Sequence, residues 1–380
     1  MIEKKYLILA VFCLSTFSYY FALQSVPPVI PQIMNSFSVT YTETGLLMFW
    51  VALPALFLSL PAGIMNVKLG PRKVGGLGLM IATAGAFITY LTLSFPMLMI
   101  GRFILGLGGI LIIISGFTGV SHWFTKDELG KIMGIYGLNM PFAIVIALNL
   151  VPRIASEFGW RTSFLIATGL LFLSILAFIF LIEERPFRRQ VENTFHGIKN
   201  KQLWILAAIW GLFVLVYMSY VTWAGTFFTE LKNIPINMAF FLASFITITA
   251  IPLTPIAGRL SDKLGKRKIF LTASSAGMVI SFLLIPGLSL PLLFLPIALL
   301  SISAAFLPPA LFALPSEILS PKMAGLGYGV LYTCWSMGIT TGPAFIGYIR
   351  DTFTGEVPIY VAMAIFSFLA MILASLLKTR

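Results

Sequence analysis

Charged residues are scarce in this sequence. Of its 380 residues 10% are charged, whereas 59% are hydrophobic and 14% are aromatic. A chain of this composition has too little polar surface to cover a water-soluble globule, so we expect lipid to be its solvent. The formal net charge of +12 does not indicate nucleic-acid binding, because the basic residues stand between apolar segments instead of gathering on one solvated face.

Cysteines and catalytic motifs are also in short supply. The two cysteines, Cys13 and Cys334, lie far apart in separate apolar runs, which argues against a disulfide framework, and we interpret both as small buried hydrophobic residues. There is no H-E-x-x-H, no G-x-S-x-G and no pair of intramembrane aspartates, so the sequence lacks these catalytic motifs of hydrolytic enzymes. We expect no enzymatic activity, no cofactor and no bound metal; a receptor that binds without translocating stays an alternative.

Acidic residues are absent from the middle of the apolar runs. All thirteen fall in loops or at predicted helix ends, and the two histidines, His122 and His196, fall on the predicted cytoplasmic side. Proton-coupled carriers generally need a titratable group inside the membrane. The inventory therefore favours a facilitator or an exchanger.

Long apolar runs are what the sequence has most of. A helix needs about 17–25 apolar residues to cross a bilayer, whereas a β-barrel would need alternating strands of about ten residues. Twelve runs qualify as helices: 6–33, 44–66, 74–94, 96–120, 131–154, 161–182, 203–228, 238–258, 269–288, 291–314, 325–349 and 358–377. The first run exceeds the roughly 7–15 residues of a signal-peptide core, so we expect an uncleaved helix.

The runs divide six and six around a polar stretch. We expect an all-α integral membrane protein whose twelve transmembrane helices form two six-helix halves with pseudo-twofold symmetry. The predicted domains are an N-terminal half at 1–182, a cytoplasmic linker at 183–202 and a C-terminal half at 203–380. Glu192–Gln202 in the linker is either a short amphipathic helix on the inner leaflet or a plain solvated segment.

Lysines and arginines set the expected orientation. Of the 25 basic residues, 20 lie on the cytoplasmic side when the N-terminus is placed inside, and four lie outside: Arg153, Arg161, Lys232 and Arg350. We therefore expect a multi-pass plasma-membrane protein with both termini in the cytoplasm. The remaining basic residue, Arg102, falls within the fourth helix.

A short basic loop occurs twice. Gly63–Lys73 reads G-I-M-N-V-K-L-G-P-R-K, and Gly258–Lys268 reads G-R-L-S-D-K-L-G-K-R-K. Two copies, each between apolar runs of its own half, indicate a duplicated membrane domain. In each copy we expect the first glycine to allow close helix packing and the second to permit a tight turn.

This loop resembles that of the major facilitator superfamily of transporters, which has the form G-x-x-x-D-R/K-x-G-R-R/K between helices 2 and 3 and is often repeated between helices 8 and 9. The resemblance covers essentially the whole chain and implies alternating access with a cytoplasmic latch. Val67 stands where the second copy has Asp262, which implies one polar latch, docked near Gly130–Lys131, instead of two. The gating residues so implied are Gly63, Gly70, Arg72, Gly258, Asp262, Gly265 and Arg267.

The resemblance also implies a substrate site near the bilayer midplane, built mainly from helices 1, 4, 7 and 10. Tyr20 and Gln24 share a helix face, and Tyr217, Tyr220 and Trp223 form an i, i+3 series. Aromatic packing between helices is the alternative for each aromatic residue. The full set of candidates is Tyr19, Tyr20, Gln24, Arg102, Asn139, Tyr217, Tyr220, Trp223 and Trp335.

Arg102 carries the prediction of substrate class. Its place four residues before Gly106 resembles the fourth-helix pattern of the superfamily. An arginine within the membrane is by default paired or functional. The alternative is that its side chain snorkels to the interface. A fixed positive charge would attract a small organic anion; the alternative is an exporter of neutral or amphiphilic drug-like compounds. We expect a monomer whose partners are this small solute and the lipid bilayer.

Overall fold

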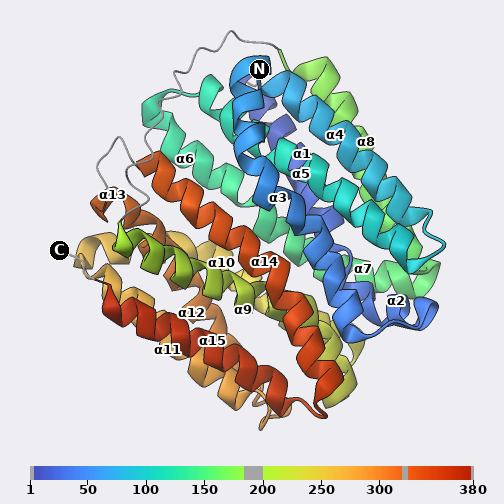
Figure 1. Cartoon of the computed structure of the whole chain (residues 1–380), viewed down its shortest axis with the longest axis vertical. Helices are drawn as coiled ribbons and strands as arrows, with labels where there is room; N and C mark the ends of the chain where they lie inside the picture. The colour runs from blue at the N-terminus through green and yellow to red at the C-terminus, as the bar shows by residue number, and fades with distance from the viewer. Residues whose placement is uncertain (1–3, 184–199, 319–323, 378–380) are drawn as a thin grey trace. The chain divides into compact units, whose positions relative to one another are not determined.

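Helices make up all the regular structure that is described. The computed structural model describes residues 4–183, 200–318 and 324–377 (Figure 1). The elements are α1 (Lys4–Gln24), η1 (Pro27–Val29), α2 (Ile30–Phe37), α3 (Tyr41–Leu69), α4 (Pro71–Tyr90), α5 (Phe95–Trp123), α6 (Lys126–Gly137), α7 (Asn139–Phe158), α8 (Trp160–Leu181), α9 (Lys201–Lys232), α10 (Ile236–Leu264), α11 (Arg267–Leu284), α12 (Phe294–Ala313), α13 (Pro315–Ile318), α14 (Ala324–Thr352) and α15 (Val357–Leu376).

The predicted all-α membrane fold is confirmed. Within the described residues eleven helical segments are long and apolar enough to cross a membrane, and α14, with 29 residues, covers the remaining predicted run. Two spans are broken. The first passes from α1 through η1 into α2, where Pro27 and Pro28 remove two backbone donors. The fifth starts at α6, earlier than predicted, and breaks at Leu138 before α7.

The chain divides into two compact units. The first holds the described residues up to Val39 and from Leu46 to 183, and the second holds Thr40–Gly45 and the described residues from Asn200 onward. The first turn of α3 therefore packs with the second unit. The predicted linker and its amphipathic segment lie mostly at 184–199, outside the described residues, so the predicted domain boundaries stay a prediction.

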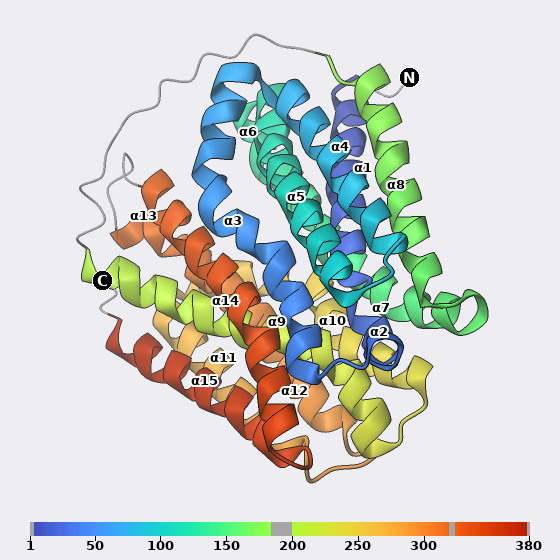
Figure 2. The same cartoon turned by 45° about the vertical axis from the view of Figure 1, so that its right-hand side comes forward.

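Small residues bring the helices of the first unit together. In this unit α4 lies along α5 and α8, and α1 packs against α5, α7 and α8 (Figures 1 and 2). A Cβ at Gly85 would lie 2.3 Å from the backbone nitrogen of Leu105, and one at Gly108 would lie 2.3 Å from that of Ala82. Lipid gives no hydrophobic drive for helix association, so close van der Waals contact at such residues holds α4 against α5.

The second unit uses the same device. Here α9 packs against α14, α10 against α12, and α11 against α12 and α15. A Cβ at Gly338 would lie 2.6 Å from the carbonyl oxygen of Gly211, and one at Gly342 would lie 2.5 Å from that of Leu215. The G-x-x-x-G spacing of Gly338 and Gly342 therefore sets how closely α14 approaches α9.

The two turns of the repeated loop need their glycines. Gly70 precedes α4 with φ 82°, and Gly265 follows α10 with φ 63°, a region that non-glycine residues enter at a cost. This agrees with the tight turns expected from the sequence. Cys13 and Cys334 are free thiols, as expected, but both are half-buried instead of buried.

Gly342→Ala tests the packing of α14 on α9. The added methyl group would overlap the backbone of α9, so we expect a loss of ~1–3 kcal/mol in stability, seen as a lower melting temperature of the detergent-solubilised protein. Gly329→Ala in the same helix is the matched control, because nothing lies within 4 Å of a Cβ there and alanine favours a helix by up to ~1 kcal/mol. Equal melting temperatures for the two variants would contradict the close crossing.

Candidate functional site

Four spans are more enclosed than the other seven of the eleven. The buried share of the apolar window is 61% for the α1–α2 span, 61% for α5, 67% for α9 and 56% for α12, and at most 44% for the rest. These four are the first, fourth, seventh and tenth runs of the sequence. They are also the helices from which the resemblance draws the substrate site.

Arg102 on α5 is fully buried and bonded to backbone carbonyls. Its Nη1 donates to the carbonyl oxygen of Ala22 at 3.0 Å, and its Nη2 donates to that of Leu23 at 3.0 Å. Its Nε lies 3.5 Å from the carbonyl oxygen of Leu47 on α3, a long hydrogen bond. Arg102 does not snorkel, because none of its surface is exposed.

The sequence around Pro27 explains why the guanidinium binds here. A helix leaves its last four carbonyls without intrahelical donors, and α1 ends at Gln24. The carbonyl of Leu23 would normally accept from the residue four positions on, which is Pro27, and proline has no N–H. Arg102 supplies donors to carbonyls at this end, where the helix dipole also favours a cation.

The charge of Arg102 has no acidic counterpart. Among the described residues it is the only charged residue with no exposed surface. Its neighbours are carbonyl oxygens and the Met48 sulfur, 3.8 Å from Nη2. Carbonyl dipoles offset part of the several kcal/mol needed to desolvate an ion, but they leave the net charge in place. The interior of the first unit is therefore electropositive at the end of α1.

Gln24 directly follows Leu23, whose carbonyl oxygen Arg102 binds. Its side chain is fully buried, and neither its amide nitrogen nor its amide oxygen has a hydrogen-bond partner among the described residues. Tyr19 is close enough to Arg102 for an electrostatic interaction, and its ring occupies the space that a Cβ at Gly109 would need. The structure thus brings Tyr19 and Arg102 together where α1 meets α5, and Gln24 is the next residue after the carbonyl that Arg102 binds.

The other two candidates of the first unit behave differently. Asn139 donates from Nδ2 to the carbonyl oxygen of Tyr136 at 2.8 Å, so it stabilises the break between α6 and α7. Tyr20 is half-buried, and its ring lies 5.4 Å from that of Tyr19 at an angle of 48°. Their assignment to the substrate site stays a prediction.

The aromatic series on α9 does not form one surface. Tyr217 bonds to Thr247 on α10 through the two hydroxyl groups, 2.9 Å apart, whereas the indole Nε1 of Trp223 donates to the carbonyl oxygen of Pro343 on α14 at 2.8 Å. Tyr220 is fully buried, with Phe282 of α11 near its ring. Six residues rotate a helix by a net angle of roughly 240°, so residues 217 and 223 face different neighbours.

A different aromatic row follows one side of α9. Trp210 stacks on Phe213 with ring centroids 5.3 Å apart, and Phe213 stacks on Tyr217 at 5.7 Å. The i, i+3, i+7 spacing of these residues is legible in the sequence, although only Tyr217 was predicted. The last predicted aromatic, Trp335 of α14, is half-buried and stacks on Tyr332 at 5.0 Å.

The repeated loops show local contacts. Asp262 is paired with Arg267 of its own loop, 3.1 Å from Oδ1 to Nη2, and Arg72 lies 3.4 Å from the carbonyl oxygen of Ile179 on α8. No described atom lies within 4 Å of a Cβ at Gly63, and at Gly258 the contact with Pro309 is an ordinary 3.6 Å. The close helix packing that we expected at Gly63 and Gly258 is therefore not present in this structure. The gating roles of the loop residues stay predictions.

Asp351, which was not predicted as a functional residue, caps the start of α3 within the second unit. Its carboxylate accepts from the backbone nitrogens of Tyr41 at 3.1 Å and Thr42 at 2.7 Å, and from the Thr42 hydroxyl at 2.5 Å. The Tyr41 hydroxyl donates to Glu230 at 2.6 Å, and Arg350 lies 5.1 Å from the centre of the Tyr41 ring. These contacts join α3, α9 and α14 at one point.

Only part of this junction could be predicted from the sequence. Thr40 and Glu43 form a reciprocal cap, because Thr40 N donates to Glu43 Oε2 at 2.8 Å and Glu43 N donates to Thr40 Oγ1 at 3.2 Å, and the T-x-x-E pattern predicts such a cap. Asp351 satisfies the two donors in between from 310 positions away, a pairing that no local pattern indicates. Across the described residues no group of three or more His, Cys, Asp or Glu residues could hold a metal.

Comparison with known proteins decides the family. The sequence model of the Major Facilitator Superfamily matches residues 12–254 and 241–380. The chain belongs to the major facilitator superfamily. It is a multi-pass membrane transporter of a small solute.

The chain is similar to two curated relatives and to one solved structure. It is 22% identical to the nitrite extrusion protein of Bacillus subtilis (strain 168) over 74% of this chain and 73% of that protein. It is 22% identical to the human lysosomal dipeptide transporter MFSD1 over 75% of this chain and 67% of that protein. A bacterial homologue of the human lysosomal transporter Spinster, solved inward-facing and occupied, shares the fold with a TM-score of 0.83 at 18% identity, over 97% of this chain and 96% of that one.

Removing the cap at Asp351 tests the junction of this transporter. Asp351→Ala leaves the backbone nitrogens of Tyr41 and Thr42 without acceptors, and loss of such a cap costs about 1 kcal/mol. We expect hydrogen exchange of a peptide spanning residues 41–45 to speed up about fivefold, as measured by mass spectrometry.

Asp351→Asn keeps a side-chain oxygen and should show a smaller increase. Glu157→Ala, which removes an exposed carboxylate from the end of α7, should leave this peptide unchanged. An unchanged exchange rate in Asp351→Ala would show that the cap does not hold the first turn of α3.

Proposed function

We propose that this transporter carries small organic anions across the plasma membrane by alternating access. The observation that carries the proposal is the buried charge of Arg102, which has no acidic partner among the described residues. At an effective dielectric constant of about 20, opposite unit charges 4 Å apart attract by ~4 kcal/mol. An anion approaching the end of α1 gains from this field even though Arg102 also binds backbone carbonyls.

Gln24 is the proposed hydrogen-bonding group for the anion. Its amide nitrogen is buried without a partner, and an amide N–H donates well to a carboxylate or a similar oxyanion. A nitrite ion is such an oxyanion, and a dipeptide ends in a carboxylate. The substrates printed in the names of the two relatives, one an inorganic oxyanion and the other a dipeptide, therefore both carry a negatively charged oxygen that Arg102 and Gln24 suit, which supports the proposal.

A second candidate substrate class is a neutral or amphiphilic compound. The row formed by Trp210, Phe213 and Tyr217 along α9 favours it, because stacked rings offer a broad apolar surface with one polar end. The first class is preferred, because the buried charge of Arg102 attracts an anion, whereas a neutral solute gains no comparable electrostatic stabilisation from it.

The proposal includes the mode of transport. Among the described residues no acidic side chain is buried, and Glu43, Glu230, Asp262 and Asp351 lie at helix ends. A facilitator or an exchanger without a membrane-embedded proton site fits this inventory. The same proposal includes a monomeric chain that neither catalyses a reaction nor binds nucleic acid. Its two halves are 1–182 and 203–380, and both termini lie in the cytoplasm. Asp262 belongs to the cytoplasmic latch.

Gln24→Glu tests the anion site. The change is isosteric and puts a negative charge one residue from a carbonyl that Arg102 binds, so it cancels the field while the donors of Arg102 keep their acceptors. We expect uptake of short carboxylates into proteoliposomes to fall more than tenfold, with an unchanged or higher melting temperature. A C-terminally amidated dipeptide, which has no carboxylate, should not compete for uptake.

Asn66→Asp is the matched control. It makes the same isosteric change at another buried amide of the first unit, roughly 27 Å along α3 from Met48, and uptake should stay within about twofold of the unsubstituted protein. Equal uptake by Gln24→Glu and the unsubstituted protein would remove the anion proposal and leave the neutral class.

A further inference from the structure

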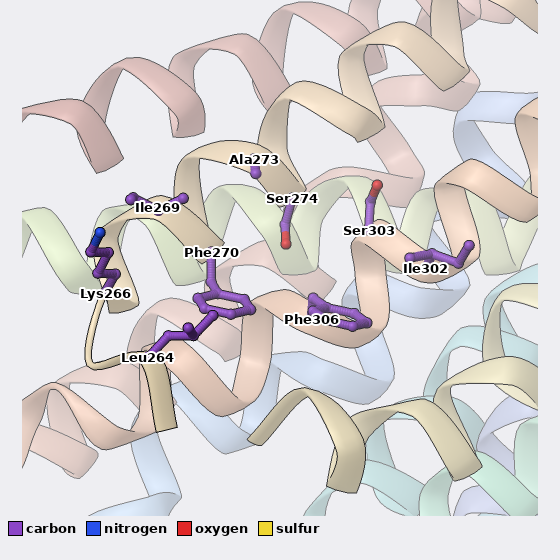
Figure 3. Close-up of a pocket in the computed structure, with 9 residues that line it drawn as sticks. All are labelled: Leu264, Lys266, Ile269, Phe270, Ala273, Ser274, Ile302, Ser303 and Phe306. Atoms are coloured by element: carbon purple, nitrogen blue, oxygen red, sulfur yellow. The ribbon is translucent and has the colours of Figure 1, made fainter. Parts of the chain in front are cut away.

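A groove opens between α11 and α12 of the second unit. It holds a volume of about 410 Å³ and ends at the turn between α10 and α11, where Leu264 and Lys266 line it. In Figure 3 Lys266 lies at one end and Ile302 at the other, with the rings of Phe270 and Phe306 between them. The groove therefore runs from a helix end toward the middle of the helices.

Most of the groove surface is apolar. The rings of Phe270 and Phe306 are parallel within 7°, with centroids 6.1 Å apart. Leu264, Ile269 and Ile302 are each about half exposed at 52%, 58% and 48%, so the rim presents large apolar side chains outward. In a membrane such a surface is matched by hydrocarbon chains.

Polar groups are confined to the floor and to one end. Ser274 and Ser303 are buried on the floor, and Lys266 is exposed at the end. The turn around it carries five basic residues within 259–268 against a single acid, Asp262, which is itself paired with Arg267. The apolar groove thus leads to a strongly positive rim.

We propose that this groove binds one anionic phospholipid of the inner leaflet. An acyl chain lies along Phe270 and Phe306, and the phosphate group contacts the Lys266 ammonium. The basic turn and the apolar trough match the two ends of such a lipid, and the cytoplasmic leaflet is the one that carries anionic lipids. The proposal rests on the orientation given under Proposed function, but not on the transported substrate.

A second groove in the first unit offers an internal comparison. It lies between α4 and α8, holds a volume of about 530 Å³, and is lined by apolar residues with Thr83 and Thr168. No basic residue lines it. It provides a comparable apolar trough without a charged end, so lipid there should show no preference for an anionic head group.

Native mass spectrometry of the purified full chain tests the site. The protein is equilibrated with an equimolar mixture of phosphatidylglycerol and phosphatidylcholine of the same acyl chains, and the bound lipids are counted. We expect one retained phosphatidylglycerol per chain. Lys266→Gln should lower its preference over phosphatidylcholine about fivefold, because one lysine near an anionic surface is worth about 1 kcal/mol. Lys266→Arg should keep the preference.

Two further pairs of variants locate the effect. Lys263→Gln removes an exposed charge of the same turn that does not line the groove, and it should change the preference less than Lys266→Gln. Ala273→Phe fills this groove and should reduce phosphatidylglycerol retention, whereas Ala84→Phe fills the other groove and should not. An unchanged preference in Lys266→Gln, or equal losses in Ala273→Phe and Ala84→Phe, would overturn the proposal.

Discussion

The contact between Arg102 and the end of α1 is the interaction on which the first unit depends. Hydrocarbon offers no water to unsatisfied backbone groups, so each one must find a partner within the protein. Pro27 removes the donor that the carbonyl of Leu23 would normally use, and Arg102 replaces it from α5. A single side chain thus supplies donors where α1 breaks, and it holds a positive charge at the carbonyl that precedes Gln24.

Arg102 therefore has a structural role and, in the proposed function, also attracts the anion. The carbonyls fix the position of the guanidinium, and they leave its charge uncompensated among the described residues. A carboxylate partner would stabilise the ion more fully, but it would also cancel the field that attracts an anion. Backbone dipoles hold Arg102 in place without that loss, which is why the arrangement suits a carrier of anions.

The sequence predicted most of the fold and less of the site. Twelve apolar runs and a duplicated loop indicated the helices and the superfamily, because length and hydropathy are local properties. The sequence predicted that Arg102 is paired or functional, but it did not indicate that the partners are backbone carbonyls of α1 and α3. The contact of Asp351 with α3 spans 310 positions. Such pairings depend on tertiary packing, which a single sequence does not show.

The two copies of the basic loop differ in their charged residues and in the contacts that these residues make. The second copy keeps Asp262, which pairs with Arg267, and its Lys266 closes an apolar groove. The first copy has Val67 at the position of Asp262, and the groove of its unit has no charged end. The acid-base pair within the loop and the lysine at the end of a groove are therefore features of the second copy, whereas Arg72 of the first copy contacts the carbonyl oxygen of Ile179.

Counterflow in proteoliposomes tests the central claim most directly. Vesicles containing the unsubstituted protein are loaded with an unlabelled short carboxylate and diluted into a trace of the labelled anion, with a protonophore present to remove any proton gradient. An anion carrier without proton coupling accumulates the label transiently above its external concentration. Accumulation that disappears with the protonophore, or binding of the label without accumulation, would contradict the account.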